Sequence, residues 1–287
     1  MHTRKALIAF LTPTLWAAGF SGTAALEFTR KAQSFGPRPA GSAANQNLQS
    51  YIVSQLKPLG CQVSYDAFTA QTPVGPVAMR NIIARFAGDS GQALVVTGHF
   101  DTKPMPGRVF VGANDGGAST GFLLELARVV SSMPRRDEIV LVWLDGEEAF
   151  GEWSDTNGTF GSRHLADKWA REGMLSRIKA LINVDMIGDK DLDIIQETNS
   201  SAPLRRLVWQ TAGEMGYGKY FLESAGAIED DHLPFLRKAV NALDLIDFDY
   251  GPDNSYWHNE KDTIDKIGAH SLEVVGEVVT AVLRKLQ

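Results

Sequence analysis

The segment that most restricts the fold of this chain is a continuous apolar run, Ile139 to Leu144, which ends abruptly in Asp145-Gly146-Glu147-Glu148. An apolar run bounded by glycine is typical of a strand buried on both faces of a sheet. Open α/β sheets keep their active sites at the carboxyl ends of such strands. Neighbouring side chains there point in different directions, so one glutamate can bind a metal while the other moves protons. A bare Glu-Glu pair is more often a solvated acidic turn, and the rest of the chain decides between the two.

Two further apolar segments end in residues that can bind a metal. Leu94 to Gly98 is followed by His99-Phe100-Asp101, and Leu181 to Val184 is followed by Asp185. Segments with helical periodicity lie between the strands, which indicates a largely parallel sheet with helices on both faces. Because parallel strands share one carboxyl edge, we expect the three segments to deliver their ligands to one site. This pattern favours a functional role for the two glutamates.

The composition indicates one domain and restricts the kind of metal site. The 287 residues contain no linker, repeat or charge block, so we expect a single α/β catalytic domain over residues 26–287. The formal net charge of −6 and the scattered basic residues argue against a nucleic-acid surface. Cys61 is the only cysteine, which excludes an intramolecular disulfide and a cysteine-based metal cluster. Any metal must therefore be held by His, Asp and Glu.

Residues 1–25 have the layout of a secretory signal peptide. A basic start, Met1 to Lys5, precedes an apolar stretch, Ala6 to Phe20, and then small residues, so we expect cleavage near Ala24 or Ala25. The alternative is an uncleaved membrane anchor, but the apolar stretch is shorter than the ~20 residues of a spanning helix and contains Pro13. We therefore predict an exported protein, periplasmic or secreted, that has no membrane contact after removal of the signal.

Two more residues complete a candidate metal site. Asp115 lies in the glycine-rich segment Val111 to Thr120, which opens a long helix. The glycines let the backbone approach an ion closely, and the helix dipole favours a carboxylate there. His258 lies in a polar loop. Alone, Asp115 is equally well a helix cap, and His258 is more often a surface histidine. Together with Glu148 they match a catalytic Zn²⁺ site, which keeps three protein ligands and one open position.

This series of residues resembles the metal-dependent aminopeptidase family M28, over nearly all of the expected mature chain. Within the family, the chain is most similar to the animal-type glutaminyl-peptide cyclotransferases, or glutaminyl cyclases. The closer agreement runs through Phe68-Thr69, Gln71 to Gly75, Asn81 to Ile83, Glu147 to Phe150, Trp153-Ser154, Gly161 to Ala166, Ile228 to Phe235 and Trp257-His258. The resemblance implies a single-domain α/β/α sandwich with a mixed, largely parallel central sheet, as in zinc aminopeptidases.

The resemblance also implies one zinc ion, held by Asp115, Glu148 and His258, with Glu147 as general base and acid. An N-terminal glutamine cyclises when its α-amine attacks its own side-chain amide carbon. That reaction needs a polarised carbonyl, a proton acceptor for the amine and a proton donor for the departing ammonia. Zinc supplies the first, and Glu147 can meet the other two. The expected substrates are peptides or proteins with N-terminal glutamine, and a monomer is expected.

The remaining roles follow from the same resemblance. Asp185 is expected to hold the substrate amine or amide, and Asp230 to share a short hydrogen bond with Asp185. Because two close carboxylates do not both ionise cheaply, one of them should stay protonated and donate. Asp231 is the alternative to Asp230. The expected substrate-binding residues are Trp153, Trp257 and Glu229. Each tryptophan lies beside a proposed catalytic or metal residue, although a tryptophan is more often part of a core.

Two other functions remain open from the sequence. His99 and Asp185 occupy the positions that hold a second zinc in ordinary aminopeptidases of the family, with Asp101 as a further candidate beside the metals. The chain therefore keeps the ligands of a two-zinc aminopeptidase, in which metals about 3.5–4 Å apart activate a water. The third alternative is an inactive binding protein on the same fold. Such a chain would be expected to have lost a ligand or Glu147, and it has lost none.

Overall fold

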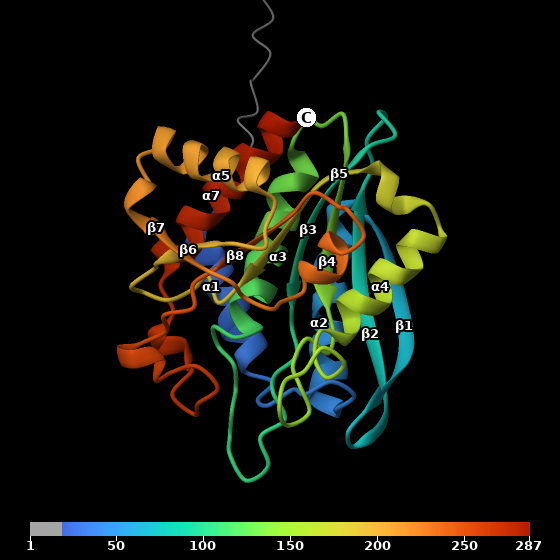
Figure 1. The fold of residues 1–287 in the computed structure, drawn as a ribbon, viewed down its shortest axis with the longest axis vertical. Coiled ribbons are helices and arrows are strands. Elements are labelled where there is room, and N and C mark those ends of the chain that lie inside the picture. Colours follow the sequence, from blue (N-terminus) through green and yellow to red (C-terminus); the bar gives the residue numbers. More distant parts are fainter. Residues whose placement is uncertain (1–18) are drawn as a thin grey trace, which may run out of the picture.

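A mixed six-stranded sheet forms the centre of the protein. The computed structural model describes residues 19–287, and the strands follow the order β1-β2-β4-β3-β5-β8 across the sheet (Figure 1). These strands are β1 (Gln62–Thr72), β2 (Gly75–Phe86), β3 (Ala93–His99), β4 (Glu138–Leu144), β5 (Ile178–Asp185) and β8 (Ala242–Ile246). Two short strands, β6 (Ile194–Glu197) and β7 (Phe221–Gly226), form a separate parallel pair.

The parallel part of the sheet places four carboxyl ends along one edge. β3 pairs in parallel with β4 and β5, and β5 pairs in parallel with β8, whereas β1–β2 and β2–β4 are antiparallel. Every residue of β3 and β8 is buried, as expected for strands covered on both faces. The segments that follow these parallel strands therefore meet at one edge of the sheet.

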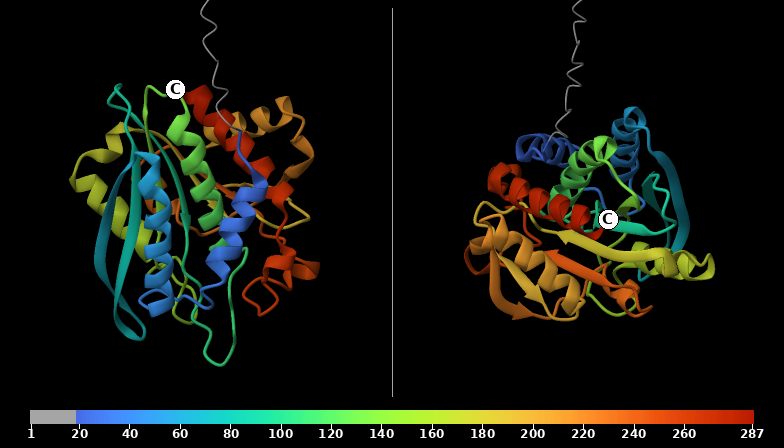
Figure 2. Two further views of the ribbon diagram at one scale, coloured as in Figure 1. Left: turned by 180° about the vertical axis from the view of Figure 1, so that it is seen from behind. Right: turned by 90° about the horizontal axis from the view of Figure 1, so that it is seen from above.

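Helices cover both faces of the sheet (Figure 2). On one face lie α1 (Gly22–Gln33), α2 (Ala43–Leu56), α3 (Gly117–Ser132) and α7 (Ala269–Leu286), and on the other lie α4 (Phe160–Arg171) and α6 (Leu233–Leu236). α5 (Ala202–Glu214) contacts α7 and β8. The architecture is the α/β/α sandwich with a mixed sheet that the sequence predicts. No helix in residues 19–287 is long and apolar enough to cross a membrane.

The structure differs from the sequence-based expectations in two places. Two prolines and a glycine between Gln71 and Pro76 predict a loop over these residues. The loop is much shorter, because β1 and β2 stay paired up to Thr72 and Gly75 and turn at Pro73-Val74. The second difference is α1, which the sequence does not predict because its first turn overlaps the expected signal peptide. Residues 1–18 of that peptide lie outside the described residues, whereas Ala25 is fully buried in α1.

A buried arginine ties the segment before α2 to the loops that carry the candidate site. The Arg38 side chain is fully buried. Its Nε donates to the carbonyl oxygen of Phe100 (2.7 Å), and its two Nη groups donate to those of Val111 (2.5 Å) and Gly112 (2.8 Å). A guanidinium group presents several donors in one plane, so this single side chain fixes the backbone on both sides of the loop that leads to Asp115.

We predict that Arg38→Met lowers the free energy of unfolding by about 3 kcal/mol or more, because several buried carbonyl groups lose a charged donor. Urea denaturation of the variant and the wild type measures this. Arg30→Met is the control, since Arg30 is 52% exposed in a surface ion pair with Glu27, and its loss should change the free energy by less than about 0.5 kcal/mol. Equal stability of the two variants would contradict the bracing role of Arg38.

Candidate metal centre and active site

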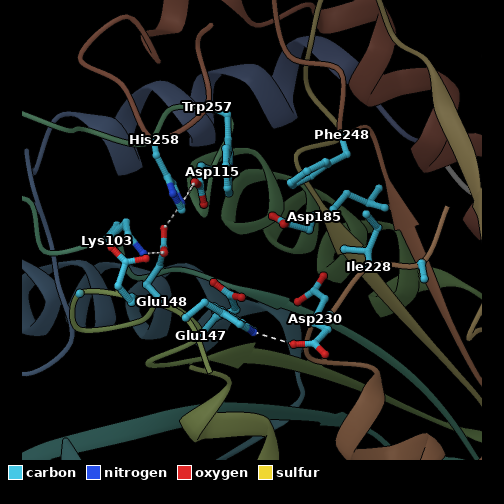
Figure 3. Close-up of a pocket in the computed structure, with 16 residues that line it drawn as sticks. Lys103, Asp115, Glu147, Glu148, Asp185, Ile228, Asp230, Phe248, Trp257 and His258 are labelled. Carbon is cyan, nitrogen blue, oxygen red and sulfur yellow. Dashed lines mark hydrogen bonds and ion pairs between the residues drawn. The ribbon is translucent and has the colours of Figure 1, made fainter. Parts of the chain in front are cut away.

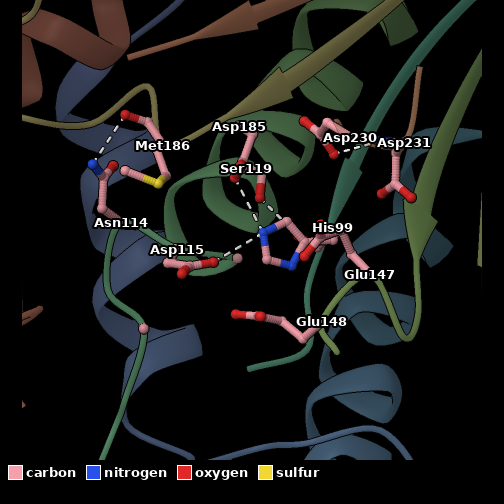
Figure 4. Close-up of polar contacts among 12 residues, drawn as sticks. His99, Asn114, Asp115, Ser119, Glu147, Glu148, Asp185, Met186, Asp230 and Asp231 are labelled. Carbon is pink, nitrogen blue, oxygen red and sulfur yellow. Dashed lines mark hydrogen bonds and ion pairs between the residues drawn. The ribbon is translucent and has the colours of Figure 1, made fainter. Parts of the chain in front are cut away.

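Segments that are far apart in the sequence bring the candidate residues together at the carboxyl edge of the sheet (Figure 3, and Figure 4 for His99). They are His99 at the end of β3, Glu147 and Glu148 after β4, Asp185 at the end of β5, Asp115 before α3, and His258 between β8 and α7. Each of these positions was predicted from the way the apolar segments end or from the loop motifs. The parallel strand register explains their convergence.

Asp115, Glu148 and His258 form a set of three metal-type donors. His258 Nε2 lies 3.3 Å from Asp115 Oδ2 and 3.2 Å from Glu148 Oε1. Both carboxylate oxygens are buried and have no hydrogen-bond partner. Buried acceptors without a donor are costly unless a cation joins them, and one imidazole nitrogen with two carboxylate oxygens is a donor set that zinc accepts. These residues therefore fit the metal that the sequence predicts.

His99, Asp115 and Asp185 form a second set of donors, which shares Asp115 with the first (Figure 4). His99 Nε2 lies 3.2 Å from Asp115 Oδ1 and 3.1 Å from Asp185 Oδ1. The donor atoms of this group all lie within 4.8 Å of one another. The side chains are therefore compatible with one metal ion or with two that share Asp115.

Asp101 belongs to neither donor set and instead holds the turn that carries the two glutamates. Its carboxylate accepts hydrogen bonds from the backbone N–H groups of Glu147 (3.1 Å) and Glu148 (3.3 Å). Its Oδ1 also lies 3.5 Å from His99 Nδ1. One buried carboxylate thus orients a candidate ligand, the candidate base and His99.

Asp262 holds the backbone of the Asp115 segment in the same way that Asp101 holds the turn of the two glutamates. Its two oxygens accept hydrogen bonds from the backbone N–H groups of Asn114 (2.8 Å) and Asp115 (3.1 Å). The next residue, Gly116, has a φ of +76°, and a Cβ there would lie 2.4 Å from the carbonyl oxygen of Asp101. Only glycine fits this turn, so the loop is fixed by a buried carboxylate and by the absence of a side chain.

Glu147 is buried and lies at the cavity, as a group that exchanges protons with a bound substrate must. Its side chain is 8% exposed and lines the cavity. Burial raises the pKa of Glu147 well above its ordinary range; His99 opposes this change, and the charges of Glu148 and Asp230 add to it. A carboxyl group whose pKa is moved toward neutrality is suited to act first as a base and then as an acid.

A cavity of about 490 Å³ opens above Glu147 and His258. Trp257, Phe248 and Ile228 form its apolar walls (Figure 3). The rings of Phe248 and Trp257 are 5.1 Å apart at 62°, and Trp257 stacks on His258 at 4.0 Å. A mostly apolar pocket with a few polar groups at its base is typical of a small-molecule or side-chain site. The structure thus places Trp257 in the pocket wall and against a candidate ligand.

Trp153 and Glu229 meet at another side of the same cavity. Trp153 Nε1 donates a hydrogen bond to Glu229 Oε2 over 2.9 Å. Both residues line the cavity, and Trp153 is 36% exposed. The hydrogen bond joins two loops that are 76 residues apart in the sequence, so the three residues expected to bind substrate all lie at one cavity.

The two consecutive aspartates after Glu229 have different surroundings. Asp230 lines the cavity, whereas Asp231 Oδ1 accepts a hydrogen bond from Ser162 Oγ (2.5 Å). Burial raises the pKa of Asp185 to about 7. The positive charge of His99 opposes this rise, and the negative charge of Asp230 adds to it. Asp185 Oδ1 contacts His99, while Asp230 accepts from Asn183 and from the N–H of Asp231. The short hydrogen bond expected between Asp185 and Asp230 stays a prediction.

Sequence reasoning missed several residues of the site. Lys103 lines the cavity, and its Nζ lies 3.7 Å from Glu148 Oε2. Phe248 follows β8, so the rule that strand ends point at the site could have identified it. Ile228 carries no such signal, because an apolar residue in a loop is not specific for a function. Asp262 could not be found either, since it contacts only backbone groups of the Asp115 segment and the Tyr250 hydroxyl.

The fold and the site define a class, the metal-dependent aminopeptidase-like α/β enzymes. Residues 81–283 match Peptidase family M28. A glutaminyl-peptide cyclotransferase of Drosophila melanogaster is 33% identical over 257 residues, which cover 80% of this chain and 72% of the relative. The chain belongs to peptidase family M28 and, within it, to the glutaminyl-peptide cyclotransferases, and it is an enzyme.

Solved structures agree with this assignment. The crystal structure of a glutaminyl cyclase from an Acidobacteriales bacterium superposes with a TM-score of 0.91 at 39% identity, and the match covers 99% of each chain. A Zn-dependent exopeptidase from Parabacteroides distasonis has a TM-score of 0.83 at 27% identity, with 93% of this chain and 99% of that chain covered. The recognition of the family and of the fold from sequence is therefore confirmed.

We predict that Asp101→Asn weakens zinc binding by about 10- to 100-fold, because one oxygen that accepts a backbone N–H becomes an amide donor and the glutamate turn loses its support. Competition with a zinc chelator measures the affinity. Asp66→Asn is the control: Asp66 is also buried, but it contacts Asn81, His164 and Lys168, so zinc affinity should not change. Unchanged affinity in both variants would contradict the supporting role of Asp101.

Proposed function

We propose that this chain is a zinc-dependent glutaminyl cyclase, which converts N-terminal glutaminyl peptides to pyroglutamyl peptides with release of ammonia. The observation that carries the proposal is one cavity that combines the Asp115, Glu148 and His258 donors, a buried carboxyl group at Glu147, and aromatic walls. The similarity to enzymes named glutaminyl cyclase supports the same reaction.

We propose one zinc ion per chain, held by Asp115, Glu148 and His258. Bound there, zinc would polarise the carbonyl group of the substrate side-chain amide. The orphan oxygens of Asp115 and Glu148 support this location. Cyclisation uses the substrate's own amine as nucleophile and needs no activated water. We therefore propose that His99 and Asp185 do not bind a second metal ion. Asp185 is assigned to bind the substrate amine.

Glu147 is assigned the proton transfers. It takes a proton from the α-amine as the amine nitrogen bonds to the side-chain amide carbon, and it gives that proton to the amide nitrogen as the carbon–nitrogen bond breaks and ammonia leaves. The raised pKa of Glu147 supports both steps. Asp185 and Asp230, which we expect to share a short hydrogen bond, are assigned to hold the amine. Trp153, Trp257 and Glu229 are assigned to enclose the glutamine side chain, because all of them line the cavity.

Export and a monomeric state are part of the proposal. The leader layout of residues 1–25 supports export. Cleavage at Ala24 or Ala25 falls within α1 and would remove Phe20, whose ring packs 5.1 Å from that of Phe122. Sequencing the N-terminus of the exported protein locates the cut.

We predict that Glu147→Gln keeps its zinc but lowers kcat by about 10²- to 10⁴-fold, because the amide neither accepts nor returns the proton. Zinc content by elemental analysis and ammonia release from a Gln-initiated peptide measure the two effects. Glu152→Gln is the matched control, since Glu152 lines the same cavity but is exposed, and it should keep most of its activity. Retention of most activity by Glu147→Gln would rule out the proton-transfer role.

The reaction itself is tested by comparing two substrates. We expect the wild-type enzyme to release ammonia from a Gln-initiated peptide and to leave a Leu-anilide intact, because the cavity is assigned to a glutamine side chain. The contrary result, anilide hydrolysis without ammonia release, would favour the two-zinc aminopeptidase, for which the donor set of His99, Asp115 and Asp185 would supply the second site. Loss of ammonia release on chelation, with recovery on zinc addition, completes the test.

A further inference from the structure

A row of polar side chains runs across three adjacent parallel strands next to the active site, from β3 to the edge strand β8. Thr97 on β3, Asn183 on β5 and Asp244 on β8 are partners in the strand register, and none is more than 1% exposed. Other positions of these strands are mostly apolar. Polar groups buried in such a sheet cost free energy unless they are hydrogen-bonded, so the partners of these three side chains decide what the row does.

The amide group of Asn183 connects this row to Asp230. Asn183 Nδ2 donates to Asp230 Oδ2 (2.8 Å) and to Asp244 Oδ1 (3.0 Å). Asn183 Oδ1 accepts a hydrogen bond from the Thr97 hydroxyl (2.7 Å). A flipped amide would turn its carbonyl oxygen toward two carboxyl groups and its NH₂ group toward the hydroxyl. The contacts on both sides therefore fix one orientation of the amide.

The backbone around Asp230 is held by a different residue, Glu197 on β6. Its Oε1 accepts a hydrogen bond from the N–H of Ile228 (3.1 Å), and its Oε2 lies 3.0 Å from His232 Nε2. These contacts lie on both sides of Asp230 in the chain, so they fix the loop independently of Asn183. Asn183 instead orients the side chain of Asp230, because it donates to one carboxylate oxygen. The other oxygen, Oδ1, accepts a hydrogen bond from the N–H of Asp231.

We propose that Asn183 is a positioning residue for Asp230: it directs the carboxylate toward the substrate amine, and the Thr97 hydroxyl fixes the Asn183 amide for this purpose. The proposal rests on the function proposed above. A carboxylate that takes an N–H donor on each oxygen is held as an acceptor, which is the state in which Asp230 can accept from an amine. Burial and the nearby Asp230 raise the pKa of Asp244 well above its ordinary range.

The first test is Asn183→Leu, which removes the donor while keeping a similar side-chain size. We expect kcat for a Gln-initiated peptide, per zinc-loaded enzyme, to fall by about 10- to 100-fold. Zinc content should stay unchanged, because the three donors are not altered. The double variant with Asp230→Asn should be no slower than Asp230→Asn alone, since Asn183 acts through Asp230. Additive losses, or a loss confined to zinc content, would overturn the proposal.

A second pair of variants covers the case in which Asn183→Leu does not fold. Thr97→Val keeps the shape but loses the hydroxyl, and we expect kcat to fall by about two- to tenfold. Thr97→Ser keeps the hydroxyl and should restore wild-type kcat. Equal kcat in Thr97→Val and wild type would overturn the proposal. A wild-type enzyme without ammonia release would instead refute the cyclase function, so the two failures are distinguishable.

Discussion

The structure depends on holding several buried carboxyl groups close together at one edge of the sheet. Asp115, Glu147, Glu148, Asp185 and Asp230 are each at most 8% exposed. Like charges a few ångströms apart repel strongly where water is excluded, so such a group persists only if cations and proton sharing offset the repulsion. The imidazoles of His99 and His258 contact these carboxylates, and the unpartnered oxygens of Asp115 and Glu148 are where a metal cation would complete the balance.

Behind the residues assigned to chemistry lie residues that hold them. Asp101 and Asp262 each accept two consecutive backbone N–H groups, one pair in the glutamate turn and the other at Asp115. Arg38 braces the loop before Asp115 through three carbonyl groups. These contacts involve the backbone, so they fix the position of the functional side chains without taking up their polar atoms.

The sequence was most informative where an apolar strand pattern ends in residues that can bind a metal or transfer a proton. Apolar strands that end in His99, Glu147-Glu148 and Asp185 predicted both the parallel sheet and the convergence of ligands, because the register of parallel strands leaves no other place for them. Asp262 and Asn183 could not be predicted, since each acts through contacts with residues more than 40 positions away. α1 was missed for a different reason, because a leader and a short helix share an apolar pattern.

The central assignment gives two adjacent glutamates different roles at a single zinc ion. Glu148 is assigned to bind the metal, and Glu147 is assigned to transfer the proton. The most direct measurement is the number and position of zinc ions in crystals of the wild-type enzyme, from anomalous scattering on either side of the zinc absorption edge. One peak among Asp115, Glu148 and His258 is the expected result. A second peak of comparable occupancy among His99, Asp115 and Asp185 would contradict it and would favour the aminopeptidase chemistry of two metals.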